Sequence, residues 1–371
     1  MADHLSQKRV ANGDAPLTVR AVLEAMIMAH EIQGVFALAN SFNRVGLDHV
    51  ILVKLASTAV TAKLMGASRE QLLSAISHAF VDGQALRTYR HAPNAGSRKS
   101  WAAGDASSRG VRLADIAMRG EMGIPGVLTV SQWGFYDVLF SHTNKDLAIK
   151  PEDQRQFGFP QGFGSYVMEN VLFKISFPAE FHAQTACEAA VRLHPQVKDR
   201  LHEVDKIVIT TQESAIRIIS KVGKLANPAD RDHCLQYMVA VPLAFGSLVA
   251  EQYGDDYHAA HPIIDELREK MEVVEDSRYS REYLEADKRS IANAIQVFFK
   301  DGSSTEQVAV EYPIGHRRRR AEGIPLLEDK FKASLATRFS DQRSAEIFAL
   351  CKDQVRLQAT PVNRFMDMWV I

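Results

Sequence analysis

The stretch Lys206-Ile-Val-Ile-Thr-Thr211 decides the fold class, because it is the first run along the chain that is typical of a β-strand. Its β-branched residues are those enriched in strands. Before it, across residues 16–140, apolar side chains recur at helical spacing. After it, residues 291–299 and 308–312 flank a glycine-containing turn and predict a β-hairpin. The chain is therefore predicted to be mainly α with an α+β part: a large all-helical domain and a smaller α+β domain.

Helices are predicted on both sides of the strands. Ser68 followed by Gln71 is a capping-box signature and predicts a helix start. Thr360 is predicted as the N-cap of a last helix, with Pro361 at its first position. The other predicted helical stretches after residue 180 are 181–193, 231–248, 263–271, 327–335 and 344–357.

These elements predict three segments. Residues 1–170 form the helical domain, residues 171–325 the α+β domain, and residues 326–371 helices that pack back on the helical domain. Residues 141–165, where the helical pattern gives way to charged and glycine-rich sequence, are predicted as a loop near a domain boundary.

Composition excludes several classes of protein. The 371 residues contain 44 Lys and Arg against 45 Asp and Glu, a net charge of −1, which disfavours nucleic acid as the main partner. No apolar run of about 20 residues is apparent, and the polar start lacks a secretory signal, so no membrane contact is expected. Three widely separated cysteines argue against disulfides, a zinc site or an iron–sulfur cluster. We expect neither metal nor cofactor.

Residues 83–104 have the most unusual local composition, because they contain no Asp or Glu. The basic residues in this stretch are Arg87, Arg90, His91, Arg98 and Lys99. Such a segment is suited to binding carboxylate or phosphate oxygens. Composition alone favours a plainer interpretation, in which acids elsewhere in the chain pair with these cations.

Two further stretches contain candidate proton-transfer groups. His49 ends the polar, glycine-bent segment 41–49, and could transfer a proton or simply begin a helix. In residues 173–182, Lys174, Glu180 and His182 flank a Phe-Pro turn in an apolar setting, where a snorkelling lysine and a capping glutamate are the plainer interpretations.

Two clusters carry a weaker signal. His233 and Tyr237 are four residues apart, which suits a shared pocket or an ordinary polar edge. The run His316-Arg-Arg-Arg-Arg320 is similar to a nucleic-acid patch, but the balanced net charge favours a surface anion site or a salt-bridged edge.

Several of these segments, read as strings, closely resemble the MmgE/PrpD family, with the similarity running from about Ala15 to Ile371. The strings are Ser41-Phe-Asn-Arg-Val-Gly-Leu-Asp-His49, Arg87-Thr-Tyr-Arg-His-Ala-Pro-Asn94, Arg98-Lys-Ser-Trp-Ala-Ala-Gly-Asp105, Gly164-Ser-Tyr-Val-Met-Glu-Asn-Val-Leu-Phe-Lys-Ile-Ser-Phe-Pro-Ala-Glu-Phe-His182, Asn227-Pro-Ala-Asp-Arg-Asp-His233 and Tyr312-Pro-Ile-Gly-His316. The resemblance implies a large all-helical domain with a smaller α+β lid domain, C-terminal helices that return to the helical domain, and a homodimer.

The resemblance also implies a reaction: removal of water from 2-methylcitrate to give an alkene, in propionate breakdown, without an iron–sulfur cluster. It places His49, Lys99, Lys174 and Tyr237 at family active-site positions. We expect His49 to act as acid or base, the two lysines to clamp carboxylates, and Tyr237 to donate to a substrate oxygen. The remaining candidate substrate-binding residues are Arg87, Arg90, His91, Arg98, Glu180 and His182.

The chain departs from the family pattern in two places. Glu180 stands where decarboxylating relatives carry a histidine, which disfavours decarboxylation. Family members also carry a helical stretch with an Asp-containing motif before the position of Ala15. We therefore expect a truncated chain with uncovered apolar surface and uncertain activity. The implied compartment is the mitochondrial matrix in a eukaryote or the cytoplasm in a bacterium.

Three alternatives remain open. The chain could act on citrate or aconitate as a related hydro-lyase or isomerase. It could be an inactive remnant that binds carboxylates or a partner subunit. More weakly, residues 317–320 could contact nucleic acid.

Overall fold

The computed structural model describes residues 1–91, 93–140 and 156–371. The described chain is mainly helical with one small sheet, which confirms the predicted fold class. It divides into two compact units. Unit 1 comprises residues 1–90, 98–170 and 331–371, and unit 2 comprises residues 91–97 and 171–330. The division places residues 91–97 with the second unit, whereas the predicted helical segment included them.

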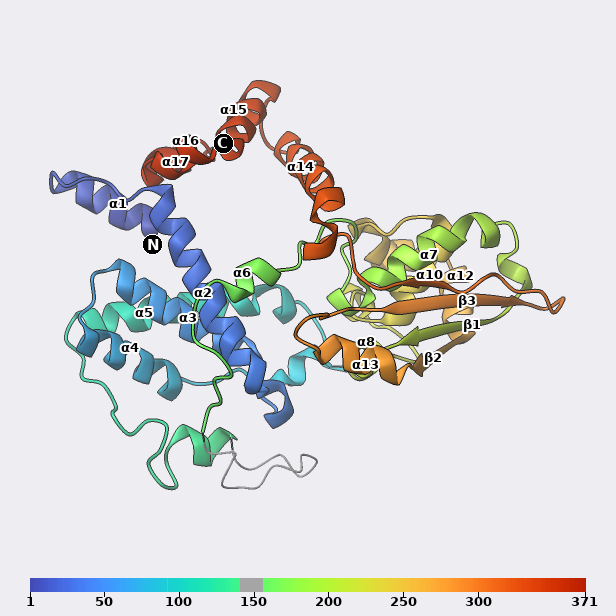
Figure 1. The fold of residues 1–371 in the computed structure, drawn as a ribbon, viewed down its shortest axis with the longest axis horizontal. Helices are drawn as coiled ribbons and strands as arrows, with labels where there is room; N and C mark the ends of the chain where they lie inside the picture. The colour runs from blue at the N-terminus through green and yellow to red at the C-terminus, as the bar shows by residue number, and fades with distance from the viewer. Residues whose placement is uncertain (92, 141–155) are drawn as a thin grey trace. The chain divides into compact units, whose positions relative to one another are not determined.

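Unit 1 consists of helices (Figure 1). They are α1 (Ala2–Ala11), α2 (Val19–Ala39), η1 (Phe42–Val45), α3 (Val50–Leu64), α4 (Arg69–Val81), η2 (Arg87–Arg90), α5 (Arg98–Met118), η3 (Tyr136–Phe140), α6 (Tyr166–Asn170), α15 (Asp341–Lys352), α16 (Gln354–Ala359) and α17 (Val362–Asp367). Residues 156–165 contain neither helix nor strand, as predicted, whereas residues 141–155 of the predicted loop lie outside the described residues.

Local sequence explains where several of these helices begin. The Ser68 hydroxyl accepts from the Gln71 amide and the Gln71 side chain accepts from the Ser68 amide, so the predicted capping box is confirmed. The last helix begins one residue later than predicted, since Pro361 is the N-cap of α17. Helix α1 was not predicted, because its sequence is polar and has no apolar face.

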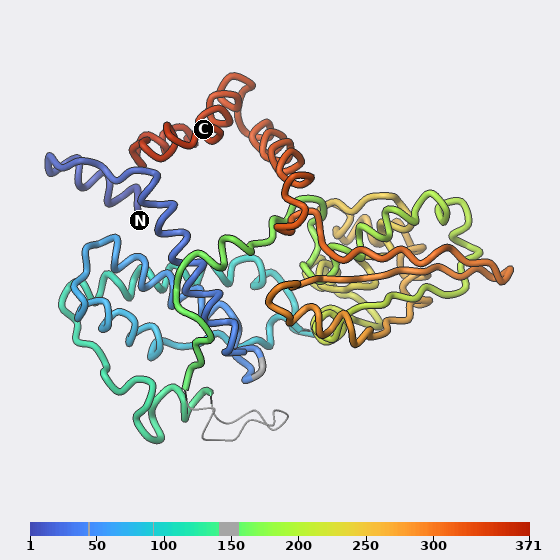
Figure 2. Tube along the Cα trace, viewed as in Figure 1, coloured from blue at the N-terminus to red at the C-terminus, as the bar shows by residue number. Residues whose placement is uncertain are grey.

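The C-terminal helices of unit 1 lie against its N-terminal ones, and Figure 2 shows the two ends of the chain meeting there. The Val19 amide donates to the Thr360 carbonyl at 2.9 Å, and the Val362 amide donates to the Leu17 carbonyl at 2.8 Å. The core of unit 1 is an aromatic cluster that includes Phe42. The other aromatic members are Phe36, Phe80, Phe135, Tyr136 and Phe140.

Helix α2 is apolar and long enough to cross a membrane by length and composition alone, so the expectation that no such run exists was wrong. The signal is weak, because packed helices of globular proteins pass the same test. Gly34 lies so close to Val167 of α6 that an added Cβ would be 2.2 Å from its side chain. Helix α2 therefore packs tightly on α6 within unit 1.

Unit 2 contains a four-stranded sheet with the order β2-β1-β3-β4. The strands are β1 (Val204–Thr211), β2 (Met271–Glu275), β3 (Asn293–Phe299) and β4 (Val308–Val310). Strands β1 and β2 are parallel, while β1–β3 and β3–β4 are antiparallel. The predicted strand and hairpin are thus confirmed, and β2 was missed.

One face of this sheet is covered by helices of unit 2. Ile207, Ile209, Ile295 and Val297 are fully buried on that face, in one core with α7 and α10. Figure 1 shows α7, α10 and α12 on this side of the strands. The helices of unit 2 are η5 (Phe181–Ala183), α7 (Gln184–Val197), η6 (Leu201–Glu203), α8 (Glu213–Ile219), α9 (Pro228–Arg231), α10 (Leu235–Phe245), η7 (Ala250–Tyr253), α11 (Asp255–Ala260), α12 (Ile263–Glu269), α13 (Ser277–Leu284) and η8 (Arg317–Arg319). Residues 320–330 of α14 (Arg320–Ala336) belong to unit 2, and the rest of that helix belongs to unit 1.

Candidate active site

In unit 1, His49 is the N-cap residue of α3 and its side chain is half exposed. Its Nδ1 lies 3.7 Å from Oδ1 of Asp48, a carboxylate that is completely buried. Unit 1 therefore offers an accessible imidazole with a buried negative charge beside it.

Asp48 is held in place by several donors. Oδ1 accepts from the Val50 amide at 3.0 Å and from Nη2 of Arg90 at 3.2 Å, and Oδ2 accepts from Nε of Arg90. Burial acts to raise the pKa of Asp48, but the hydrogen bond from Arg90 and the charge of His49 outweigh it and the pKa lies below its usual value. Asp48 is therefore a carboxylate at neutral pH.

Acidic side chains outside residues 83–104 pair with some of the cations in this basic run. Arg90 is largely buried against Asp48, and Arg98 lies 3.7 Å from Asp105. The plainer interpretation thus applies to these two residues. Arg87 is partly buried in η2, and His91 is exposed and belongs to unit 2. Substrate contact by any of the four stays a prediction.

Lys99 lies partly buried in the first turn of α5, directly after Arg98, which lines a small polar cavity. This cavity of about 220 Å³ is lined by Lys54, Arg98 and Arg109 together with Asp105 and residues of α3 and α5. Burial lowers the pKa of Lys54 to about 8, although the charge of nearby Asp82 opposes the shift. Each of the three cations has an acidic partner: Lys54 and Arg109 lie 3.8 and 3.4 Å from Asp82, and Arg98 lies 3.7 Å from Asp105.

In unit 2, Lys174 lies in the segment before η5, where its Nζ is 5.1 Å from the centre of the Phe181 ring. Burial lowers its pKa, and the negative charges of Glu180 and Asp232 oppose that shift. The preceding residue, Phe173, donates its amide to the Gly315 carbonyl at 3.0 Å. The Tyr312–His316 motif therefore fixes the backbone that carries Lys174.

Glu180 and His182 form a close pair. Oε1 and Oε2 of Glu180 lie 2.8 and 2.9 Å from Nδ1 of His182, and Oε2 also accepts from the His182 amide at 2.8 Å. Burial acts to raise the pKa of Glu180, but the hydrogen bonds and charge of His182 outweigh it and leave the pKa lowered. Glu180 is thus a capping glutamate, as the plainer interpretation held, and it is an ionised partner for His182.

Tyr237 was expected to line a pocket, but the structure places it in the core of unit 2. It is fully buried in α10, and its hydroxyl donates to the Gln252 carbonyl at 2.6 Å. Burial raises its pKa to about 12. His233 precedes α10 and so does not share a helical face with Tyr237, and its Nδ1 lies 2.7 Å from Asp232. A substrate contact by Tyr237 stays a prediction, which requires its hydroxyl to leave Gln252.

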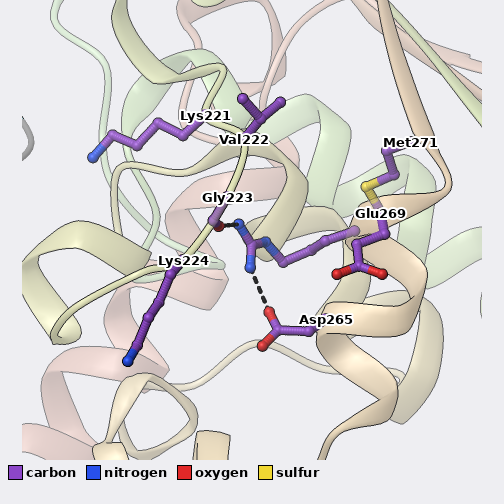
Figure 3. A pocket seen from close by; sticks show the side chains of 8 residues that line it. Lys221, Val222, Gly223, Lys224, Asp265, Glu269 and Met271 are labelled. Atoms are coloured by element: carbon purple, nitrogen blue, oxygen red, sulfur yellow. Dashed lines mark hydrogen bonds and ion pairs between the residues drawn. The ribbon is translucent and has the colours of Figure 1, made fainter.

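Two larger cavities fit a tricarboxylate poorly. One of about 440 Å³ in unit 2 lies between residues 221–224 and α12, and Figure 3 shows its lining. Arg268 donates there to Asp265 and to the Gly223 carbonyl. The cation Lys221 is likewise paired, with Asp230 at 2.6 Å. The other, of about 860 Å³ in unit 1, is lined mostly by apolar and aromatic side chains. None of the predicted site residues lines either cavity.

The arginine run 317–320 forms a salt-bridged edge in unit 2. Arg319 contacts Glu188 at 2.8 Å and Glu322 at 2.8 Å, and Arg318 donates to the Lys288 carbonyl at 3.1 Å. These partners support the salt-bridged alternative over a nucleic-acid patch.

Sequence reasoning did not single out three residues that the structure places in these clusters: Asp48, Lys54 and Tyr283. Asp48 directly precedes His49, which was a readable signal. Lys54 also had a readable signal, because it is a lysine inside an otherwise apolar helix. Tyr283 had no signal, because only the fold brings its hydroxyl to Nε2 of His182, at 3.3 Å. Within the described part of the chain, no group of three His, Cys, Asp or Glu side chains is arranged to hold a metal ion.

Comparison with known proteins was made for the whole chain. Residues 1–148 match the MmgE/PrpD N-terminal domain, and residues 177–354 match the MmgE/PrpD C-terminal domain. The chain belongs to the MmgE/PrpD family. The match therefore includes residues 1–14, which precede the segment from Ala15 that resembles the family in sequence.

Named MmgE/PrpD relatives are similar along the entire chain. A 2-methylcitrate dehydratase of Cupriavidus necator is 57% identical and one of Escherichia coli K12 is 56% identical, each over all of this chain and 74% of the relative. A mitochondrial 2-methylcitrate dehydratase of Yarrowia lipolytica is 55% identical over 95% of this chain and 65% of the relative.

Proposed function

We propose that the chain is a hydro-lyase that removes water from 2-methylcitrate to give 2-methyl-cis-aconitate in propionate catabolism. The observation that carries the proposal is the identity of 55–57% to 2-methylcitrate dehydratases along the whole chain. Both units contain imidazoles, lysines and paired carboxylates, which are the side chains that this elimination needs.

The reaction has two demands. A proton on the carbon next to a carboxylate must be removed, and the hydroxyl must leave with a proton to become water. The first needs a base, together with cations that stabilise the negative charge developing on the carboxylate. The second needs an acid.

His49 meets the acid or base requirement in unit 1, because its imidazole is accessible and Asp48 stabilises its protonated form. Lys99 and Lys174 bind substrate carboxylates. The lowered pKa of Lys174 would rise towards its usual value beside a substrate carboxylate, because a nearby negative charge favours the ammonium form.

We further propose that the reaction uses no metal or other cofactor and that the protein is a homodimer. Related enzymes include bacterial proteins and a mitochondrial one. The compartment we propose is accordingly the cytoplasm in a bacterium and the mitochondrial matrix in a eukaryote.

Substrate comparison tests the function. The purified chain is assayed with 2-methylcitrate and with citrate, and alkene formation is followed by ultraviolet absorbance. We expect kcat/KM for 2-methylcitrate to exceed that for citrate by at least about tenfold, the discrimination that one methyl group supplies in a fitted pocket. Equal or reversed preference would support a citrate or aconitate hydro-lyase instead. Binding of 2-methylcitrate without turnover would support the inactive carboxylate-binding protein.

A further inference from the structure

Glu180, His182 and Tyr283 form a hydrogen-bonded chain within unit 2. The Glu180 carboxylate contacts Nδ1 of His182 at 2.8 Å, and Nε2 of the same ring lies 3.3 Å from the Tyr283 hydroxyl. The two rings are tilted by 46° with their centres 5.6 Å apart. The order carboxylate, imidazole, hydroxyl is that of groups in which a base activates a hydroxyl.

The carboxylate determines which nitrogen of His182 carries the proton. The lowered pKa of Glu180 keeps it ionised, and an ionised carboxylate only accepts hydrogen bonds. Nδ1 must therefore carry a hydrogen, and in the neutral ring Nε2 is then an acceptor. The Tyr283 hydroxyl consequently donates to Nε2.

The surrounding fold holds all three groups. Glu180 caps η5 through the His182 amide, and the His182 carbonyl accepts from Nδ2 of Asn293 on β3 at 2.8 Å. Helix α13, which carries Tyr283, is fixed where Ser280 Oγ accepts from the Glu213 amide at 2.9 Å. His182 is almost fully buried, whereas Tyr283 remains partly exposed.

This arrangement makes His182 unsuitable as a direct substrate ligand, because both its ring nitrogens are occupied and the ring is covered. The oxygen of Tyr283, a partly exposed residue, is the end of this hydrogen-bonded series that can accept a proton from a ligand. Charged side chains from several elements interact electrostatically with Glu180 or Tyr283. They are Lys174, Glu213, Arg217, His233 and Arg289.

We propose that Tyr283 receives the substrate proton in the dehydration, with His182 as the base behind it and Glu180 as the residue that positions His182. The inference rests on the proposed function and assigns the base that this function leaves open.

The step balances as follows. The substrate C–H bond breaks and its proton moves to the Tyr283 oxygen, while the original Tyr283 proton moves to Nε2 of His182. The electron pair of the C–H bond forms the new C=C bond, and the C–O pair leaves with the hydroxyl, which takes a proton from a separate acid to become water. Tyr283 ends neutral, and His182 ends as an imidazolium beside the Glu180 carboxylate. The imidazolium then returns its proton to solvent through Tyr283.

The activity test is Tyr283→Phe, which removes only the hydroxyl, with Tyr279→Phe on the same helix as the matched control. We expect Tyr283→Phe to lower kcat by about 10²-fold or more, the usual loss when a proton-transfer group is removed, with KM changed by less than about twofold. The control should retain wild-type kcat. Wild-type kcat in a folded Tyr283→Phe protein would overturn the proposal.

A second measurement separates this proposal from the proposed function. ¹⁵N NMR of the His182 ring in the whole protein should show a protonated Nδ1 and an unprotonated Nε2. Glu180→Gln should weaken that preference, whereas Tyr283→Phe should move only the Nε2 signal. A ring protonated mainly at Nε2 would overturn the relay even if the enzyme turns over 2-methylcitrate. If the wild type has no dehydratase activity, the proposed function fails, and the NMR result alone decides whether the hydrogen-bonded relay exists.

Discussion

His49 is the residue on which the proposed chemistry of unit 1 depends. Its half-exposed ring lies beside a buried carboxylate, so it can exchange protons with a ligand while Asp48 stabilises its charged form. The nearby pair of Asp48 and Arg90 is buried and therefore fixes the backbone from which His49 projects.

Replacing His49 by Ala should abolish turnover of 2-methylcitrate, by at least about 10²-fold in kcat, because a proton-transfer group is lost. The fold should be unchanged, since the side chain is half exposed. Steady-state kinetics with circular dichroism checks both points, and His202→Ala, whose side chain is 79% exposed, is the control. A folded, fully active His49→Ala protein would refute the role.

Lys54 should make stability depend on pH. Its pKa in the folded protein is about 8 against 10.5 in the unfolded chain, so between these values the unfolded chain binds more protons and stability rises with pH. The total gain is about 3 kcal/mol across that window. The free energy of unfolding of the wild type relative to Lys54→Met, measured by urea denaturation from pH 7.5 to 10.5, should therefore increase. A flat difference would contradict burial of the amine.

At the level of elements, the sequence predicts best where a local signal and the tertiary environment agree. Ser68 and Gln71 begin a helix by contacts within one turn, so the capping box was readable. Strand β2 was missed because Glu272 and Glu275 interrupt its short apolar run. Tyr237 was expected in a pocket, yet α10 is apolar on nearly every side, and a helix of that composition buries its tyrosine as well.

Gly315 links two distant segments of unit 2. A Cβ at this position would lie 1.7 Å from the Phe173 carbonyl oxygen, so any side chain must displace the backbone that carries Lys174. Gly315→Ala should destabilise the protein by about 1–3 kcal/mol, as overpacking usually does, and lower kcat/KM for 2-methylcitrate. Denaturant unfolding and kinetics measure both effects. Gly104→Ala, where a Cβ meets nothing within 4 Å, is the control and should cause neither change.

At the level of the whole molecule, the family match covers residues of both units. The proposed site residues are found in each unit: His49 and Lys99 lie in unit 1, while Lys174, Glu180 and His182 lie in unit 2. Composition and periodicity predicted the helical and α+β parts, but they could not name the substrate. That inference required the resemblance of whole motifs.

Chelation should leave the activity intact. We expect dialysis against EDTA, followed by metal analysis, to change kcat by less than about twofold, since the proposed proton transfers and carboxylate contacts come from side chains alone. Loss of activity that added iron or zinc restores would contradict the cofactor-free proposal.

The most direct test of the proposed function is to add 2-methylcitrate to the purified chain and identify the product by NMR while ultraviolet absorbance is recorded. We predict a rise in absorbance together with the alkene signals of 2-methyl-cis-aconitate, and no such rise with His49→Ala. A folded wild-type protein that leaves 2-methylcitrate unchanged would contradict the assignment as a dehydratase.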